Sequence, residues 1–255
     1  MKFITTRAVI LQTKDANEAD VIVDFLDEKG TRLRALAKHG RRSRKRFVNA
    51  FGTLSLVTLR YRHYGDRLWL EDGKLEKAFS LGDDPPLVAG LKDLVREVLL
   101  NLLPEGEGNP ENFFLLLGFL NALASRQAER SVELTDIFLL RQTAISGYLP
   151  AFDRCDICGA DLSSVRRWVW QLSPFRVTCA THFLSGTMKW EWDGEILSII
   201  KSSISFPVGR LWNIRMSAFK APVLLKNICS WLEMLISKEL KSYRWILERG
   251  LKETT

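Results

Sequence analysis

The chain has 255 residues, of which 46% are hydrophobic and 26% are charged, with a net charge of +7 and a pI of about 9.3. This composition excludes wholesale disorder, and the length allows one large domain or two to three small ones. The start of the chain has no apolar stretch of signal-peptide length, and the most apolar run, residues 113–120, is far shorter than the roughly 20 residues that cross a bilayer. We therefore expect a cytoplasmic protein with no membrane partner.

The positive charge is concentrated at the N-terminal end. Residues 1–80 hold 17 Lys and Arg against 10 Asp and Glu, whereas residues 81–255 hold 20 against 20. A cationic unit joined to a neutral body suggests that the first part handles a polyanion and the rest does something else. The alternative is a basic surface that serves only solubility.

Residues 1–80 have the pattern of a small β-barrel of the OB or SH3-like kind. In the third strand, alternation places Leu33, Ala35 and Ala37 on one face and polar side chains on the other. The five expected strands cover residues 7–12, 21–26, 31–38, 53–61 and 67–71.

A block of cations follows the third strand and ends near Phe47. Like charges this close cannot pack into a core, so the block is either a solvated loop without a partner or a loop that binds a polyanion. Basic residues with interleaved aromatic rings suit sequence-tolerant binding of single strands, although about half of the rings in a small barrel should be core. The rings are Phe47, Phe51, Tyr61, Tyr64 and Trp69. The candidate nucleic-acid contacts are Arg32, Arg34, Lys38, Arg41, Arg42, Arg44, Lys45 and Arg46.

Helical spacing begins after the Asp-Asp-Pro-Pro sequence at 83–86. The second helix should start at Asn109-Pro110-Glu111, which combines a capping side chain with proline and an acid in the first turn. Cys229 falls among the apolar positions of the last helix, as a buried small hydrophobe. The helices are expected over 87–103, 109–128, 134–146, from 193 to the break at 206–207, and over 222–247.

The other three cysteines and one histidine form two ligand pairs, CDIC at 155–158 and CATH at 179–182. Thiolates and a neutral imidazole at this spacing suit tetrahedral Zn²⁺. The alternatives are a disulfide, which a reducing compartment disfavours, a redox pair, which lacks its usual βαβ setting here, and a chance cluster. Four protein ligands leave no open position for water, so we expect a structural zinc ion held by Cys155, Cys158, Cys179 and His182.

No pattern in the sequence asks for catalysis. The nucleotide-binding loops, the serine elbow and the deaminase HxE pattern are all missing, and His39 and His63 have no evident partner. We expect a binding protein and not an enzyme. Two other classes stay open: an RNA- or ribosome-associated zinc protein built on an OB-like barrel, and a metal-dependent nucleic-acid enzyme.

Residues 8–79 resemble the bacterial RecO family of recombination mediators in the opening strand, in the turn Glu18-Ala19-Asp20, and in the strand that ends in a basic run. The segments 147–150 (GYLP) and 239–242 (ELKS) are also similar to that family. His39-Gly40 stands where the family often has glycine and a small residue, and His182 stands where many members have a fourth cysteine.

The resemblance implies an α+β protein: an OB-fold barrel over 1–80, a helical domain over 81–150 and 193–255, and a zinc-binding insertion over 151–192. It implies ATP-independent binding and annealing of single- and double-stranded DNA at the nucleoid. The implied partners are RecR, the C-terminal tail of single-strand-binding protein and, indirectly, RecA.

The resemblance supplies a polyanion for the cations, and their positions on a strand or in a loop suggest different roles. We expect Arg32, Arg34 and Lys38 to form a fixed rim, and residues 41–46 to form a mobile loop that orders on DNA. Lys238, Lys241 and Arg244 can serve the protein tail, or they can equally be dipole partners at a helix C-terminus.

Overall fold

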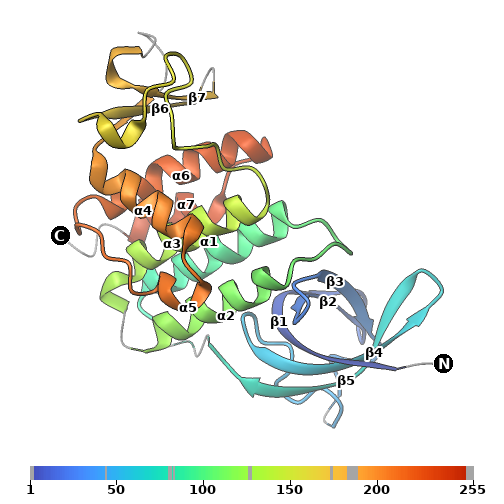
Figure 1. The fold of residues 1–255 in the computed structure, drawn as a ribbon. Coiled ribbons are helices and arrows are strands. Elements are labelled where there is room, and N and C mark those ends of the chain that lie inside the picture. Colours follow the sequence, from blue (N-terminus) through green and yellow to red (C-terminus); the bar gives the residue numbers. More distant parts are fainter. Residues whose placement is uncertain are drawn as a thin grey trace. The chain divides into compact units, whose positions relative to one another are not determined.

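The computed structural model describes residues 3–250, except 44, 80, 81, 83, 126, 127, 173, 174 and 183–188. Figure 1 shows the ribbon of the chain. Internal contacts divide the chain into two compact units. The first is formed by residues 1–128 and 240–255, and the second by residues 129–239. Among the helices that the structure describes, none is long and apolar enough to cross a membrane.

The first unit contains a closed barrel of five strands in the order β1-β2-β3-β5-β4, with β4 returning to β1. β3 and β5 run parallel, whereas the other neighbouring pairs are antiparallel. This is the OB-type barrel that the sequence predicts. Its strands are β1 (Ile4–Asp15), β2 (Val21–Asp27), β3 (Arg32–Ala37), β4 (Leu56–Tyr64) and β5 (Arg67–Lys77).

The barrel is filled by the alternate residues of its strands. Ala35 and Ala37 of β3 are buried in the core and the partly buried Leu33 packs against it, which confirms the predicted inward face. The connection from β3 to β4 contributes as well, because Phe47 and Ala50 are 4% and 0% exposed and pack in the same core. The basic segment is therefore anchored at its far end by a buried ring.

Helices complete the first unit. The helix that starts at Pro110 begins as predicted, because the Asn109 side chain accepts a hydrogen bond of 3.0 Å from the Glu111 amide and Pro110 opens the first turn. The elements are α1 (Pro86–Leu102), α2 (Pro110–Ala124), α7 (Lys241–Trp245) and a π-helical turn (Ile246–Gly250).

The loop between α1 and α2 lies against the turn between β2 and β3. Backbone bridges join Thr31 to Gly108 and Arg32 to Glu105. Gly30 adopts a φ of +70°, and a Cβ at this position would lie 1.7 Å from the carbonyl oxygen of Asn109. Only glycine permits this approach, which places Glu105 beside β3.

The second unit consists of helices and a three-stranded sheet in the order β7-β6-β8. The sheet packs on a helix through Trp170 of β6 and Trp231 of α6, whose ring centroids are 5.4 Å apart. Cys229 of α6 is fully buried, as predicted. The elements are α3 (Ser131–Ile145), β6 (Trp168–Leu172), β7 (Phe175–Cys179), β8 (Lys189–Trp192), α4 (Gly194–Ser205), α5 (Val208–Leu211) and α6 (Ala221–Ile236).

The single long helix predicted over 222–247 is wrong, because α6 ends at Ile236 and Ser237 takes a left-handed φ of +52°. The chain restarts as α7, where the Glu97 carboxylate accepts hydrogen bonds of 3.1 and 2.8 Å from the amides of Lys241 and Ser242. Tertiary contacts thus override a continuous amphipathic pattern. Lys241 lies at a helix N-terminus, so its predicted role as a C-terminal dipole partner is wrong.

The close approach at Gly30 generates a stability prediction. Gly30→Ala should lower the free energy of unfolding by about 3 kcal/mol, because the left-handed φ and the clash with Asn109 act together. Gly65→Ala is the matched control: its φ is +57° but no atom lies within 4 Å of a Cβ, so it should cost only about 1 kcal/mol. Urea unfolding followed by circular dichroism measures both, and equal losses would contradict the role of the loop contact.

Candidate nucleic-acid interface and metal site

Arg32 is bound to the chain itself. Its Nη1 donates to the carbonyl oxygens of Leu100 and Leu103 at 2.8 and 2.9 Å, and its Nη2 lies 3.4 Å from Asp24 Oδ1. The Arg32 side chain is 13% exposed and that of Asp24 is 1% exposed. The guanidinium therefore joins β3 to the end of α1, and its predicted contact with DNA stays a prediction.

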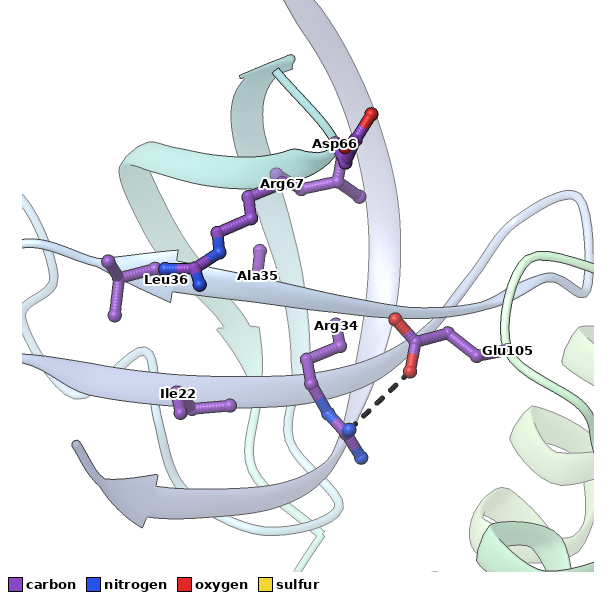
Figure 2. A pocket seen from close by; sticks show the side chains of 8 residues that line it. Ile22, Arg34, Ala35, Leu36, Asp66, Arg67 and Glu105 are labelled. Carbon is purple, nitrogen blue, oxygen red and sulfur yellow. Dashed lines mark ion pairs between the residues drawn. The ribbon is translucent and has the colours of Figure 1, made fainter. Parts of the chain in front are cut away.

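Arg34, two residues further along β3, points to the surface and is 45% exposed. Its Nη2 lies 3.0 Å from Asp24 Oδ1, and its Nη1 lies 3.5 Å from Glu105 Oε2, the pair drawn in Figure 2. The hydrogen bond to Asp24, aided by the negative charges of Asp24 and Glu105, raises the pKa of Arg34 above its usual value. Arg34 is thus a fixed cation at the edge of a pocket.

The basic segment after β3 is held by contacts of its own. Arg46 donates to the Lys38 carbonyl oxygen at 2.5 Å and accepts at its own carbonyl from the Gly73 amide at 2.8 Å. Arg41 pairs with Asp15 at 3.0 Å. These contacts tie Arg41 and Arg46 to the barrel, and the expected ordering of this segment on DNA stays a prediction.

The remaining cations of the segment are more open. Arg42 lies 4.0 Å from Glu18, and the two side chains are 72% and 96% exposed. Lys45 is exposed, and Arg44 lies outside the described residues. Arg42 and Lys45 are therefore the described cations of this segment that are best placed to meet a phosphate.

The acidic turn between β1 and β2 faces these cations. Asp20 accepts hydrogen bonds from the His39 amide and from the Asn17 side chain, at 2.8 and 2.9 Å, and these bonds lower the pKa of Asp20 below its usual value. With Asp15 and Glu18 on the same turn, part of the local positive charge is neutralised. The sequence indicated this turn only through its resemblance to the family, and not its contacts with the basic segment.

The predicted aromatic set divides in two. Phe47 and Tyr61 are core residues, and Phe51 stacks on Phe47 with centroids 4.9 Å apart. Tyr64 is 50% exposed and stacks on Trp69 at a centroid distance of 4.2 Å. The expectation that about half of the rings belong to the core is confirmed.

Sequence reasoning missed Arg67 and Glu105 at the pocket beside β3. Arg67 begins β5, directly after the hairpin turn, and is exposed. Its place in that hairpin was the available signal, because the loop between the fourth and fifth strands of an OB-fold lines the binding face. Glu105 gave no signal, because only the docked loop brings it to β3.

The second unit gathers the four predicted metal ligands. The ligand atoms of Cys155, Cys158, Cys179 and His182 all lie within 4.8 Å of one another. The sulfur atoms of Cys158 and Cys179 are 3.9 Å apart, and Cys179 Sγ lies 3.0 Å from His182 Nδ1. Sequence spacing alone had indicated this cluster.

Local backbone contacts build the cluster. The Gly159 amide donates to the Cys155 carbonyl oxygen at 2.9 Å, and the φ of +73° at Gly159 closes this turn. Asp156 fastens the turn to β7, because its amide donates to the Val177 carbonyl at 2.9 Å and its carboxylate accepts from the Val177 amide at 2.7 Å. Cys179 ends β7, and His182 ends the 3₁₀ turn that follows.

The donor set fits a metal ion. Metal–sulfur bonds of about 2.3 Å in a tetrahedron place two sulfur atoms about 3.8 Å apart, close to the 3.9 Å between Cys158 and Cys179. The Thr181 hydroxyl, 3.1 Å from Cys179 Sγ, lowers the pKa of that thiol. Burial raises the pKa of Cys155, but hydrogen bonds from neighbouring amides outweigh it and hold the pKa below its usual value. Both effects favour the thiolate form that binds metal.

The barrel with its exposed cations, the helices and the Cys₃His cluster define an OB-fold protein with a group of four residues that could hold a metal ion. Two family models match the chain: Recombination protein O N terminal over residues 1–76, and Recombination protein O C terminal over residues 94–244. The chain belongs to the RecO family of DNA repair proteins, as the resemblance indicated.

Individual relatives agree over nearly their full lengths. The DNA repair protein RecO of Syntrophobacter fumaroxidans is 35% identical over 244 residues, which cover 96% of this chain and 97% of that protein. The DNA repair protein RecO of Pelotomaculum thermopropionicum is 27% identical over 249 residues, covering 96% and 94%. The DNA repair protein RecO of Bifidobacterium adolescentis is 24% identical over 255 residues, covering 96% and 99%.

The contacts of Arg32 and Arg34 predict different losses of stability. Arg32→Met should lower the free energy of unfolding by about 3 kcal/mol, because Asp24 keeps its buried charge with one cation fewer and two helix carbonyls lose their donor. Arg34→Met should cost less than about 1 kcal/mol, since its side chain is 45% exposed. Urea unfolding of both variants tests the assignment, which a larger loss for Arg34→Met would contradict.

Proposed function

We propose that this protein binds DNA without catalysing a reaction on it, anneals complementary strands, and mediates recombination in DNA repair. The observation that carries the proposal is the OB barrel with exposed cations on and beside its third strand and its last hairpin. Membership in a family of DNA repair proteins supports the assignment of DNA as the polyanion.

The physical basis of annealing is charge neutralisation. Two complementary strands repel each other through their phosphates, and a surface of Lys and Arg side chains lowers this repulsion while it releases counterions. Contacts to phosphate carry no sequence information, so the same surface accepts any strand. Neither effect requires ATP, in agreement with a sequence that contains no nucleotide-hydrolysis loop.

The family assignment extends the proposal to partners and to location. We infer that the protein works with RecR, contacts the C-terminal tail of single-strand-binding protein, and helps RecA to replace that protein on single strands. Its place would be the cytoplasm, at the nucleoid. Lys241 and Arg244, both in the first unit, are the cations that we assign to the acidic tail.

We infer that the metal ion is Zn²⁺ and that its role is structural. Three thiolates and an imidazole are the ligands that zinc prefers, and a closed set of four protein ligands leaves no position for a reactive water. When bound, the ion would hold the turn at 155–159 to the end of β7 and to the turn that contains His182. X-ray absorption that shows an S₃N sphere without water would support this role and count against a metal-dependent enzyme.

The basic segment should set the salt dependence of DNA binding. Replacing Arg42 and Lys45 together by alanine removes two exposed cations, so affinity for oligo-dT should fall roughly tenfold and the log–log slope with salt by about 1.4. The control variant replaces two exposed cations of the second unit, Arg210 and Lys226, and should bind as the wild type does. Fluorescence anisotropy between low and moderate salt measures this, and an unchanged slope in the Arg42/Lys45 variant would refute the assignment.

Strand annealing tests the proposed function directly. Complementary oligonucleotides coated with single-strand-binding protein should anneal faster when the protein is added without ATP. Failure to anneal these strands, despite tight DNA binding, would reject the mediator proposal. Displacement of labelled oligo-dT by RNA far more readily than by DNA would instead favour an RNA-binding protein.

Loss of one metal ligand should affect the second unit alone. Cys158→Ser should reduce the zinc content from about one ion per chain and lower the thermal midpoint of the second unit by roughly 10 °C, while oligo-dT binding persists. Cys229→Ala is the control, because this buried cysteine lies outside the cluster and its loss should leave the zinc content intact. Elemental analysis and calorimetry are the measurements, and full zinc content in Cys158→Ser would contradict the ligand set.

A further inference from the structure

A pocket opens on the barrel surface where β3 separates from β5. The two strands pair only through Ala35 with Leu68 and Leu36 with Trp69. Next to this short pairing lies a pocket of about 290 Å³, seen in Figure 2. It is near the lower limit of ligand-pocket size, so one flat group of modest size fits it. Its lining residues are Ile22, Arg34, Ala35, Leu36, Asp66, Arg67, Leu68 and Glu105.

The pocket combines an apolar floor with cations at its edge. Ile22 and Leu36 supply aliphatic surface, and in Figure 2 the Arg67 side chain extends from the hairpin across Ala35 toward Leu36. Arg34 stands at the other side, paired with Glu105 at 3.5 Å. Within the part of the chain that the structure describes, the Arg67 side chain has no ion-pair partner. A heteroaromatic base with a phosphate attached has the chemistry that matches these two parts.

The stacked pair of rings lies next to this pocket along the strands. Tyr64 is the register partner of Arg67 in the β4–β5 hairpin, and Trp69 is the register partner of Leu36. Both residues that carry the rings are thus backbone neighbours of residues that line the pocket. Rings and pocket form one continuous surface, which we call the β3–β5 surface.

Within this pair Tyr64 is the more exposed ring. The centroids of Tyr64 and Trp69 are 4.2 Å apart at an interplanar angle of 21°, and Lys38 Nζ lies 4.4 Å from the centroid of the Trp69 ring. Arg62 Cζ lies 5.9 Å from the same centroid, so three neighbouring groups surround the half-buried indole ring. Tyr64 is 50% exposed, and its outer face is directed away from Trp69.

We propose that the β3–β5 surface binds two consecutive nucleotides of a single strand: one base stacks on Tyr64, and the adjacent nucleotide enters the pocket with its phosphate on Arg67. This inference rests on the proposed DNA binding and names the residues that hold the strand. Trp69 and Lys38 act as supports that fix the tyrosine ring. Stacking is tolerant of sequence because every base has a π-face.

Glu105 makes the Arg34 side of the pocket less favourable for a phosphate. Its carboxylate lies beside Arg34, where it repels a phosphate and weakens the attraction of Arg34 for one. Asp66 also lines the pocket beside Arg67, but Arg34 is engaged by two carboxylates, Asp24 and Glu105, so we assign the phosphate to Arg67. Glu105→Gln should tighten the binding of oligo-dT about twofold to threefold at low salt, since a single exposed repulsion is lost.

Tyr64→Ala tests the stacking contact. It should weaken binding of oligo-dT about tenfold, whereas Tyr64→Phe, which keeps the ring and loses only the hydroxyl, should bind as the wild type does. Phe114→Ala on α2 is the control, because this ring is 55% exposed and lies on a different element of the same unit. Circular dichroism of each variant verifies that the fold is retained.

Photocrosslinking gives a second readout on the wild-type protein. Oligo-dT with a single 5-iododeoxyuridine should crosslink to the peptide that contains Tyr64 and Trp69. Wild-type affinity in Tyr64→Ala, or crosslinks confined to other peptides, would overturn the inference while leaving annealing by the wild type in place. If the wild type itself fails to bind oligo-dT, the proposed DNA binding fails first and this inference fails with it.

Discussion

The buried guanidinium of Arg32 holds together the parts of the first unit. It neutralises Asp24 inside the barrel wall and donates to the last carbonyls of α1, where a cation also compensates the negative end of the helix dipole. Two charges removed from water cost several kcal/mol unless their geometry is good, so this contact tolerates little change. The same junction brings the α1–α2 loop to β3, and with it Glu105 to Arg34. An interaction that binds no ligand thereby shapes the edge of the binding surface.

Much of this fold could be predicted from the sequence, because its signals are local. Alternation along β3, the cap at Asn109 and the spacing of Cys155, Cys158, Cys179 and His182 each act over a few residues, and the structure has all three. Features that depend on contacts between residues distant in the sequence could not be predicted. The break after Ile236 depends on a carboxylate of α1, and the amphipathic pattern runs through it unchanged. Arg32 looked like one more surface cation because nothing nearby in the sequence reveals the helix carbonyls it meets.

The count of charges in the sequence overestimates the surface that is available to bind a polyanion, because it does not reveal which cations form ion pairs in the fold. Arg7, Arg41, Arg60 and Arg62 form ion pairs with carboxylates of other barrel strands, so the positive excess of the first 80 residues is partly neutralised. The Arg46 guanidinium donates hydrogen bonds to the backbone carbonyl oxygens of Glu71 and Lys38. The cations that we assign to phosphate contacts are fewer and lie in two places, the outer part of the basic segment and the β3–β5 surface. A strand that contacts both would cross the barrel and not merely follow one loop.

The restart of the chain at α7 has a consequence for how the protein is made. The first unit is interrupted at residue 128 and resumes only at residue 240. The Glu97 carboxylate cannot accept its hydrogen bonds until Lys241 and Ser242 have been synthesised. The surface of α1 at Gly90 likewise stays uncovered until the ring of Trp245 packs on it. At the usual speed of translation the ribosome needs roughly ten seconds to supply them. During that interval the barrel is complete while α1 still exposes the surface that α7 will cover, so a nascent chain passes through a stage in which its N-terminal unit depends on sequence not yet synthesised.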